Sequence, residues 1–186
     1  MQRPLPDLPL KISPVRLFFA LWPDEETRRQ LAHWRDVLRR QTGGRAMDTD
    51  DLHLTLAFIG DVAPDLQPSI IAATESVQAR SFLLTIDRAE YWKHNRIVWA
   101  GCHTRPAALD EMVRELRNTL SKAGIRFDHK SFVPHITLLR DAPHDFELAD
   151  LTPIEWQIDR FVLLRSSSGQ RPRYRVAQEW RANSPR

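Results

Sequence analysis

Cysteine is almost missing from this chain of 186 residues, since Cys102 is the only one. A single cysteine excludes an internal disulfide and a cysteine-based metal cage, and it fits a reduced, cytoplasmic location. No apolar run approaches the roughly 18 residues that a membrane-spanning helix needs. A Gly-rich phosphate loop of the Walker type is also missing, which argues against ATP-driven chemistry. We therefore expect a cytoplasmic protein with no membrane partner.

The net charge is small and positive. The 27 lysines and arginines exceed the 24 aspartates and glutamates by three. Arginine supplies most of the positive charge, and its planar fork suits phosphate groups. This balance suits an anionic ligand, although a solvated arginine-rich surface explains any single arginine equally well.

Hydrophobic periodicity predicts a mixed architecture. Residues 1–14 hold four prolines and are expected to form a flexible arm, followed by one domain over 15–186. Strands are expected at 15–22, 52–59, 82–91, 96–102, 132–139, 158–164 and 174–180. Helices are expected at about 24–40, 68–80 and 109–120. Hairpins mixed with helices favour an α+β fold with antiparallel pairing.

One tetrad with the pattern His-apolar-Thr-Leu occurs twice. The copies are His53-Leu54-Thr55-Leu56 and His135-Ile136-Thr137-Leu138, each on an expected strand. Side chains alternate between the two faces of a strand. Each strand therefore buries an aliphatic face and presents a histidine and a threonine together on the other face. Either copy alone is readily explained by hydrogen bonds within a sheet; the repetition favours a shared site.

Such a pair suits the hydrolysis of a phosphodiester. In-line displacement needs a base for water on one side of phosphorus and an acid for the leaving oxygen on the other. Histidine serves both roles because its pKa lies near neutrality. Threonine hydroxyls on the same face can donate hydrogen bonds to the non-bridging oxygens. No metal or other cofactor is required in this scheme.

Other residues allow competing interpretations. A metal site built from Cys102, His103 and His129 is conceivable, but the spacing fits no common ligand pattern. Trp92 and Tyr174, together with Phe132, can stack on nucleobases or can belong to the core.

At the two tetrads and their flanks the sequence resembles the 2H phosphoesterase superfamily, and within it the bacterial RNA 2′,3′-cyclic phosphodiesterases, long labelled 2′-5′ RNA ligases. The similar segments include RLFFALWP near the start, DLHLTLAFIG, FVPHITLLR and the stretch from Phe161 to Trp180. The resemblance implies a bilobal α+β fold. Two antiparallel sheets related by a pseudo-twofold would surround a central cleft, with the helices on the outside.

The resemblance also implies roles for five residues. His53 would donate a proton to the leaving ribose oxygen, and His135 would be the proton acceptor for water. Thr55, Thr137 and Arg140 would bind the phosphate. Strict alternation nevertheless places Arg140 on the face opposite the histidine that precedes it.

The implied reaction is hydrolysis of RNA 2′,3′-cyclic phosphate ends to 2′-phosphomonoesters, with possible reverse 2′-5′ ligation. The expected partner is RNA with such an end, or a small cyclic nucleotide, bound by a monomer. Two alternatives stay open at this point. One is another 2H activity, on 2′-5′ linkages or nucleotide cyclic phosphates. The other is an RNA- or nucleotide-binding module without turnover, against which the intact histidines and threonines of both tetrads argue.

Overall fold

The structure is a computed structural model that describes residues 13–147, 150–167, 169 and 171–183. Residues 1–12 of the expected arm lie outside the described residues. The arm and the single domain over 15–186 both stay predictions. No helix in the described part of the chain is long and apolar enough to cross a membrane.

Ten strands and three α-helices form the described part of the chain. The strands are β1 Val15–Leu21, β2 Arg45–Ala46, β3 Leu54–Val62, β4 Phe82–Ile86, β5 Arg88–Trp92, β6 Ile97–Gly101, β7 Ile136–Arg140, β8 Ile154–Ile158, β9 Arg160–Ser166 and β10 Tyr174–Arg181. The helices are α1 Glu25–Thr42, α2 Gln67–Thr74 and α3 Ala107–Lys122.

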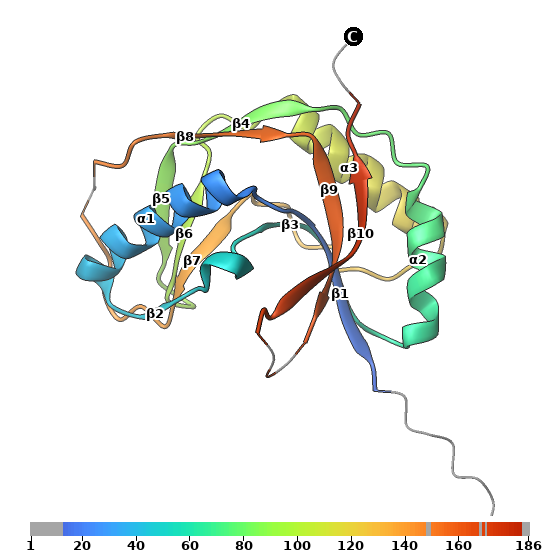
Figure 1. Cartoon of the computed structure of the whole chain (residues 1–186), viewed down its shortest axis with the longest axis horizontal. Helices are drawn as coiled ribbons and strands as arrows, with labels where there is room; N and C mark the ends of the chain where they lie inside the picture. Colours follow the sequence, from blue (N-terminus) through green and yellow to red (C-terminus); the bar gives the residue numbers. More distant parts are fainter. Residues whose placement is uncertain (1–12, 148–149, 168, 170, 184–186) are drawn as a thin grey trace, which may run out of the picture.

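The strands confirm the predicted α+β class with antiparallel sheets. The main sheet has the order β10-β9-β1-β3-β7-β6-β5, with β2 also paired to β7, and β4 pairs with β8 in a second sheet. Two halves meet in the main sheet where Leu54 of β3 pairs with Ile136 of β7. One half contains β1, α1 and β3 in chain order, and the other contains β6, α3 and β7. This correspondence is the expected pseudo-twofold, and Figure 1 shows the helices on the outside of the sheet.

Helix α1 begins and ends at the residues that cap it. The Asp24 carboxylate accepts a hydrogen bond from the backbone N–H of Thr27 at 2.7 Å, which satisfies an otherwise unpaired donor of the first turn. Gly43, with φ of 66°, follows the last turn, and its N–H donates to the Arg39 carbonyl at 2.9 Å. The buried residues of α1 are Thr27, Leu31, Trp34, Leu38 and Thr42.

Each of the two long helices packs on the motif strand of the other half. Helix α1 packs on β7 and β8, whereas α3 packs on β3 (Figure 1). The face of α3 that does so carries the periodic residues that predicted the helix. They are Leu109, Met112, Val113, Leu116 and Leu120, and all are buried. The two halves are therefore held together by exchanged helices as well as by the sheet.

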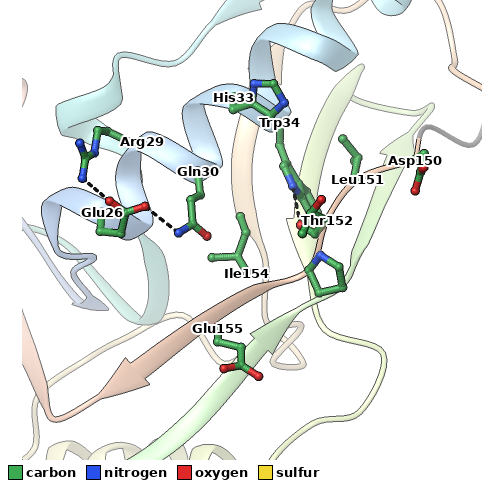
Figure 2. Close-up of a pocket in the computed structure, with 11 residues that line it drawn as sticks. Glu26, Arg29, Gln30, His33, Trp34, Asp150, Leu151, Thr152, Ile154 and Glu155 are labelled. Carbon is green, nitrogen blue, oxygen red and sulfur yellow. Dashed lines mark hydrogen bonds and ion pairs between the residues drawn. The ribbon is translucent and has the colours of Figure 1, made fainter.

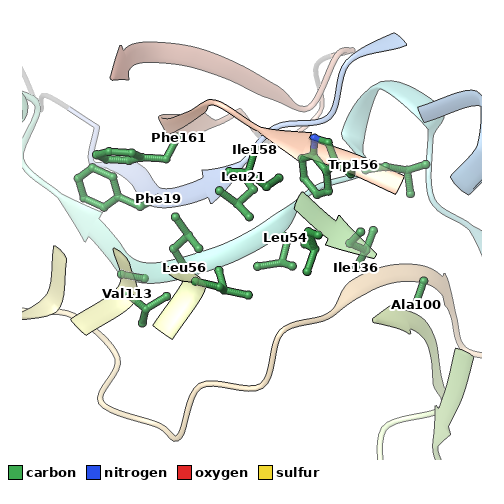
Figure 3. Close-up of a cluster of buried hydrophobic side chains, with 14 of the residues drawn as sticks. Phe19, Leu21, Leu54, Leu56, Ala100, Val113, Ile136, Trp156, Ile158 and Phe161 are labelled. Carbon is green, nitrogen blue, oxygen red and sulfur yellow. The ribbon is translucent and has the colours of Figure 1, made fainter. Parts of the chain in front are cut away.

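One continuous core underlies the motif strands. Leu54, Leu56 and Ile136 are each at most 1% exposed and pack beside Trp156 of β8 (Figure 3). Burying a leucine or isoleucine side chain fully contributes about 1.5–3 kcal/mol. The apolar side chains of both tetrads thus anchor the strands, and their histidines and threonines are left to the opposite face.

Two predicted elements break or end earlier than expected, and one strand of the structure was not predicted. The single strand expected over 82–91 is two strands, because the chain turns at Asp87. The Asp87 carboxylate accepts the backbone N–H of His103 at 2.7 Å, and its own N–H donates to Gly101. β4 therefore leaves the main sheet and pairs with β8, a strand the sequence did not indicate. The helix expected over 68–80 ends at Thr74, after which Val77 and Ala79 turn into the core.

Candidate active site

Both tetrads open onto one cavity on the face of the sheet opposite the core, and we call it the catalytic cavity because His53 and His135 both line it. Its volume is about 250 Å³. The residues that line it are Arg16, Phe18, Met47, Asp51, His53, Thr55, Phe58, His135, Thr137, Arg140, Ser166, Arg173 and Tyr174. The five residues that the sequence analysis assigned to the site all line this cavity: His53, Thr55, His135, Thr137 and Arg140. The structure thus brings them together, while their chemical roles stay predictions.

The two histidines are held in the same way. Nδ1 of His53 lies 2.7 Å from the carbonyl oxygen of Asp51, and Nδ1 of His135 lies 2.8 Å from that of Val133. A carbonyl oxygen only accepts, so each Nδ1 must carry a hydrogen and donate it. The proton that each ring can gain or lose is therefore on Nε2. Each ring can act there as a base when neutral and as an acid when protonated.

Aromatic rings surround both imidazoles. The His53 ring lies 5.0 Å from Phe18 and 4.9 Å from Tyr174, measured between ring centroids. The His135 ring lies 4.7 Å from Trp92 in an edge-to-face arrangement. These contacts fix the orientation of the rings and withdraw them from water.

The surroundings favour neutral imidazoles in the free protein. Burial lowers the pKa of His53 to about 4, and the positive charges of His135, Arg140 and Arg173 act in the same direction. The hydrogen bond to Asp51 opposes this change only in part. Burial also lowers the pKa of His135, again with a contribution from Arg140. Arg140 and Arg173 line the same cavity, so an anion bound there would meet two positive charges.

A bulge in β7 brings Arg140 into the cavity. Strict alternation puts Arg140 on the face opposite the motif side chains. Val98 and Trp99 are consecutive in β6, but their partners in β7, Leu139 and Thr137, lie two residues apart. The extra residue of β7 is a β-bulge, and it shifts the alternation by one position. Arg140 consequently lines the cavity beside the second tetrad.

Gly44 allows the chain to approach the backbone of Arg140 closely. Its φ is +86°, and a Cβ placed there would lie 2.8 Å from the Arg140 carbonyl oxygen and 2.8 Å from Cα of Ala142. Directly after it, Arg45 of β2 pairs with Arg140. Only glycine fits both the conformation and the space. The β2 segment thus supports the strand end that carries Arg140.

Sequence reasoning did not assign Arg16, Ser166 and Arg173 to the site. The sheet order brings them to the cavity: β9 pairs with both β1 and β10, so residues from these three distant segments lie side by side. Arg16 is paired with Asp61 at 2.9 Å. Tyr174, which was considered for base stacking, lines the cavity next to His53. No local pattern marks these residues, since their position depends on strands far apart in the chain.

The remaining histidines lie outside the catalytic cavity. The conceivable site of Cys102, His103 and His129 does not form, because no group of three or more metal-ligating side chains occurs in the described ranges. His103 contacts Asp87 at 3.1 Å instead, and His129 packs on Phe127.

A larger hollow of about 780 Å³ lies between α1 and residues 150–155 (Figure 2). Glu26 bonds Arg29 and Gln30 there, and the Trp34 indole donates to the Thr152 carbonyl at 3.1 Å. These groups satisfy one another, and no residue of either tetrad lines this hollow. Its size therefore does not make it the centre of the chemistry.

The family model for LigT-like phosphoesterases matches residues 21–99 and 103–174. The chain belongs to the LigT-like phosphoesterase family. Both tetrads fall within the matched segments.

Two members of the LigT-like phosphoesterase family are similar to this chain over nearly their whole length. An RNA 2′,3′-cyclic phosphodiesterase of Escherichia coli K12 is 35% identical, with 90% of this chain and 97% of the relative covered. One from Thermotoga maritima is 31% identical, with coverages of 89% and 94%. The crystal structure of E. coli LigT complexed with 3′-AMP has a TM-score of 0.78 at 33% identity, and covers 91% of this chain and 98% of that one.

Proposed function

We propose that this protein hydrolyses RNA 2′,3′-cyclic phosphate ends to 2′-phosphomonoesters. The observation that carries the proposal is the paired geometry of His53 and His135. Each donates Nδ1–H to a backbone carbonyl two residues earlier and lines the same cavity. The names of the relatives from E. coli and T. maritima support the same reaction.

In the proposed mechanism, the roles of the histidines follow the family resemblance. His135 accepts a proton from water at Nε2 as the water oxygen attacks phosphorus. His53 donates a proton from Nε2 to O3′, and the P–O3′ bond breaks on the opposite side. Thr55 and Thr137 donate hydrogen bonds to the non-bridging oxygens, and Arg140 neutralises their charge. The product keeps its phosphate on O2′.

The low pKa of His53 in the free protein is compatible with its role as the acid. Burial lowers this pKa to about 4, with further contributions from the nearby cations Arg140 and Arg173 and from coupling to His135. A bound phosphodiester adds a negative charge next to the imidazole and compensates those cations. The pKa of His53 then rises, so the proton that the leaving oxygen needs is taken up together with the substrate. Substrate binding and protonation are thus coupled.

Further properties belong to the same proposal. We take residues 15–186 as one bilobal domain that acts as a monomer in the cytoplasm. RNA with a cyclic phosphate end, or a small cyclic nucleotide, is its partner. No metal or cofactor enters the proposed steps, since every proton transfer and every phosphate contact has a side chain of this chain assigned to it.

The test uses an oligonucleotide ending in a 2′,3′-cyclic phosphate, incubated with the purified protein in excess EDTA. We expect a 2′-phosphate, identified by chromatography against 2′- and 3′-phosphate standards. Activity that disappears with EDTA and returns with Mn²⁺ or Zn²⁺ would contradict the metal-free scheme. A 3′-phosphate product would show that the P–O2′ bond breaks instead of the P–O3′ bond. If the protein binds the oligonucleotide but does not hydrolyse it, the alternative of an RNA-binding module without turnover would hold.

A further inference from the structure

A tryptophan and an arginine lie next to His53 without lining the catalytic cavity. The Trp22 ring lies 6.3 Å from the His53 ring, measured between centroids. The Arg28 guanidinium in turn lies over the Trp22 ring, 4.4 Å from its centroid. Neither Trp22 nor Arg28 belongs to the wall of the catalytic cavity. Arg28 can therefore act on the reaction only through its neighbours.

The indole of Trp22 is the main contact of the Arg28 guanidinium. Its Nε and Nη2 atoms are buried, and within the described residues neither has a hydrogen-bond partner. Burial lowers the pKa of Arg28, and the carboxylates of Asp50, Asp24 and Asp51 act in the opposite direction. A cation that is withdrawn from water and lies over an indole face makes the stronger kind of cation–π contact. Arg28 therefore fixes the position of the Trp22 ring.

His135 has a similar pair of neighbours. The Trp99 ring lies 6.2 Å from the His135 ring in an edge-to-face arrangement, and 5.1 Å from the ring of Trp92, which also contacts His135. The Arg88 guanidinium lies over the Trp99 ring, 5.5 Å from its centroid. Gly101 leaves space for that ring, since a Cβ there would lie 2.6 Å from Trp99. Each motif histidine thus contacts a tryptophan that carries an arginine.

The backbone alone does not fix the two imidazoles. The hydrogen bond from Nδ1 to a carbonyl holds one atom of each ring, but it leaves the ring able to rock about that contact. An aromatic ring packed against the imidazole removes this freedom, provided that the aromatic ring is itself held. A displacement of about 1 Å in a reacting group costs about 10²-fold in rate. The position of each Nε2 therefore depends on the contacts of the tryptophan next to it.

We propose that Arg28 and Arg88 are positioning residues, each of which orients one motif histidine through a tryptophan ring. This inference rests on the proposed function, in which His53 is the acid and His135 is the base. Arg28 then matters where the leaving oxygen needs a proton, and Arg88 matters wherever water is activated. The two arginines are therefore distinguishable by the leaving group of the substrate, although neither lines the catalytic cavity.

The test compares two substrates in matched variants. We measure kcat and KM for an oligonucleotide ending in a 2′,3′-cyclic phosphate and for a nitrophenyl phosphodiester, whose leaving group needs little protonation. Arg28→Met is expected to lower kcat on the cyclic phosphate about 10- to 100-fold, with KM unchanged and a much smaller loss on the nitrophenyl substrate. Arg88→Met should lower kcat on both substrates alike. Arg105→Met is the control and should change neither, because Arg105 lies over the Phe132 ring and neither of these two residues lines the catalytic cavity.

The outcomes separate this inference from the proposed function. If the unmodified protein hydrolyses neither substrate, both fail. If Arg28→Met and Arg88→Met lose no more activity than the control, or if each loses the same factor on the two substrates, the arginines do not position the histidines and the hydrolase still stands. The pattern of Arg28→Met must also follow that of His53→Ala, and the pattern of Arg88→Met that of His135→Ala. A mismatch overturns the inference even if the acid and base roles prove to be exchanged. Should Arg28→Met fail to fold, Arg28→Lys, which keeps a cation over the ring, should show the same pattern with a smaller loss.

Discussion

Leu54 of β3 pairs with Ile136 of β7, and this pair lies midway between the two histidine motifs. Extending the antiparallel register by one residue on each side places the histidine of each motif opposite the threonine of the other. The pair is thus the centre of the pseudo-twofold. Two reacting groups on opposite sides of one phosphorus atom are a natural use of such symmetry, and this defines the first test.

The two histidines should differ in their dependence on the leaving group. His53→Ala and His135→Ala are each expected to slow hydrolysis of a cyclic phosphate about 10²–10⁴-fold, the usual contribution of one general acid or base. A nitrophenyl ester needs little protonation on departure. On that substrate His53→Ala should recover part of its activity and His135→Ala should not. Rescue of His135→Ala instead would exchange the two roles. His33→Ala, outside the catalytic cavity, is the control.

The protonation of His53 should be visible in both stability and binding. Its pKa is about 4 in the folded protein and about 6.5 when unfolded. The unfolded chain therefore binds more protons between pH 4 and 6.5, so His53 contributes a loss of folding free energy as pH falls through that window and no loss above it. His53→Gln should flatten this part of the pH–stability curve.

NMR titration of the imidazole measures the same group directly. A pKa well below 6.5 is expected in the free protein, with an increase on adding a 2′-phosphate product. If the pKa of His53 stays the same when the product is added, anion binding and proton uptake are not coupled.

Arg140 should matter for the reacting phosphate and not for charge in general. Arg140→Ala is expected to reduce kcat/KM about 10- to 100-fold, since a hydrogen bond to a charged group contributes about 1.5–3 kcal/mol. Arg39→Ala, at the exposed end of α1, removes the same charge far from the site and should have little effect. The measurement is hydrolysis at several salt concentrations, because counterion release makes RNA binding weaken with salt in both variants. Equal, small losses in the two would take Arg140 out of the site.

Gly44 and Gly124 form a matched pair that tests the support of Arg140. Both have positive φ, of 86° and 69°, but a Cβ on Gly124 meets nothing within 4 Å. Gly124→Ala should therefore cost only the backbone strain, about 1 kcal/mol. Gly44→Ala adds a collision with the Arg140 backbone and should lower both the free energy of unfolding and the affinity for a 2′-phosphate product. Denaturant unfolding and inhibition constants measure the two effects, and identical results for both variants would exclude this supporting role.

The sequence allowed prediction of the parts that depend on local pattern. The tetrads, the capped helix α1 and the periodic face of α3 were all predicted, because alternation and helical spacing act over a few residues. Arg140 could be brought to the site only by the family resemblance, because a bulge in β7 breaks the alternation. A bulge has no sequence signature of its own here. Its cause is the pairing of β7 with β6, which lies about forty residues earlier in the chain.

Other parts of the fold are decided by partners distant in sequence. The break at Asp87 depends on two backbone partners: the Gly101 carbonyl accepts from the Asp87 N–H, and the His103 N–H donates to the Asp87 carboxylate. Without those partners the pattern of residues 82–91 predicts one strand. Arg173 and Tyr174 lie beside His53 because β9 joins β1 to β10. Neither residue carries a local signal of that neighbourhood.

The order in which this sheet can be completed has a consequence for synthesis of the protein. Arg16 of β1 pairs with Ser166 of β9, and Tyr174 of the final strand closes the wall beside His53. Strand β1 must therefore wait until β9 and β10 have left the ribosome, and pairings this remote in sequence form slowly. A nascent chain that ends before β9 exposes one edge of β1, so chains truncated at residue 159 should aggregate or bind chaperones. Pulse-labelling should show activity only after β10 has left the ribosome. Catalytic competence therefore cannot be acquired before β9 and β10 have been synthesised.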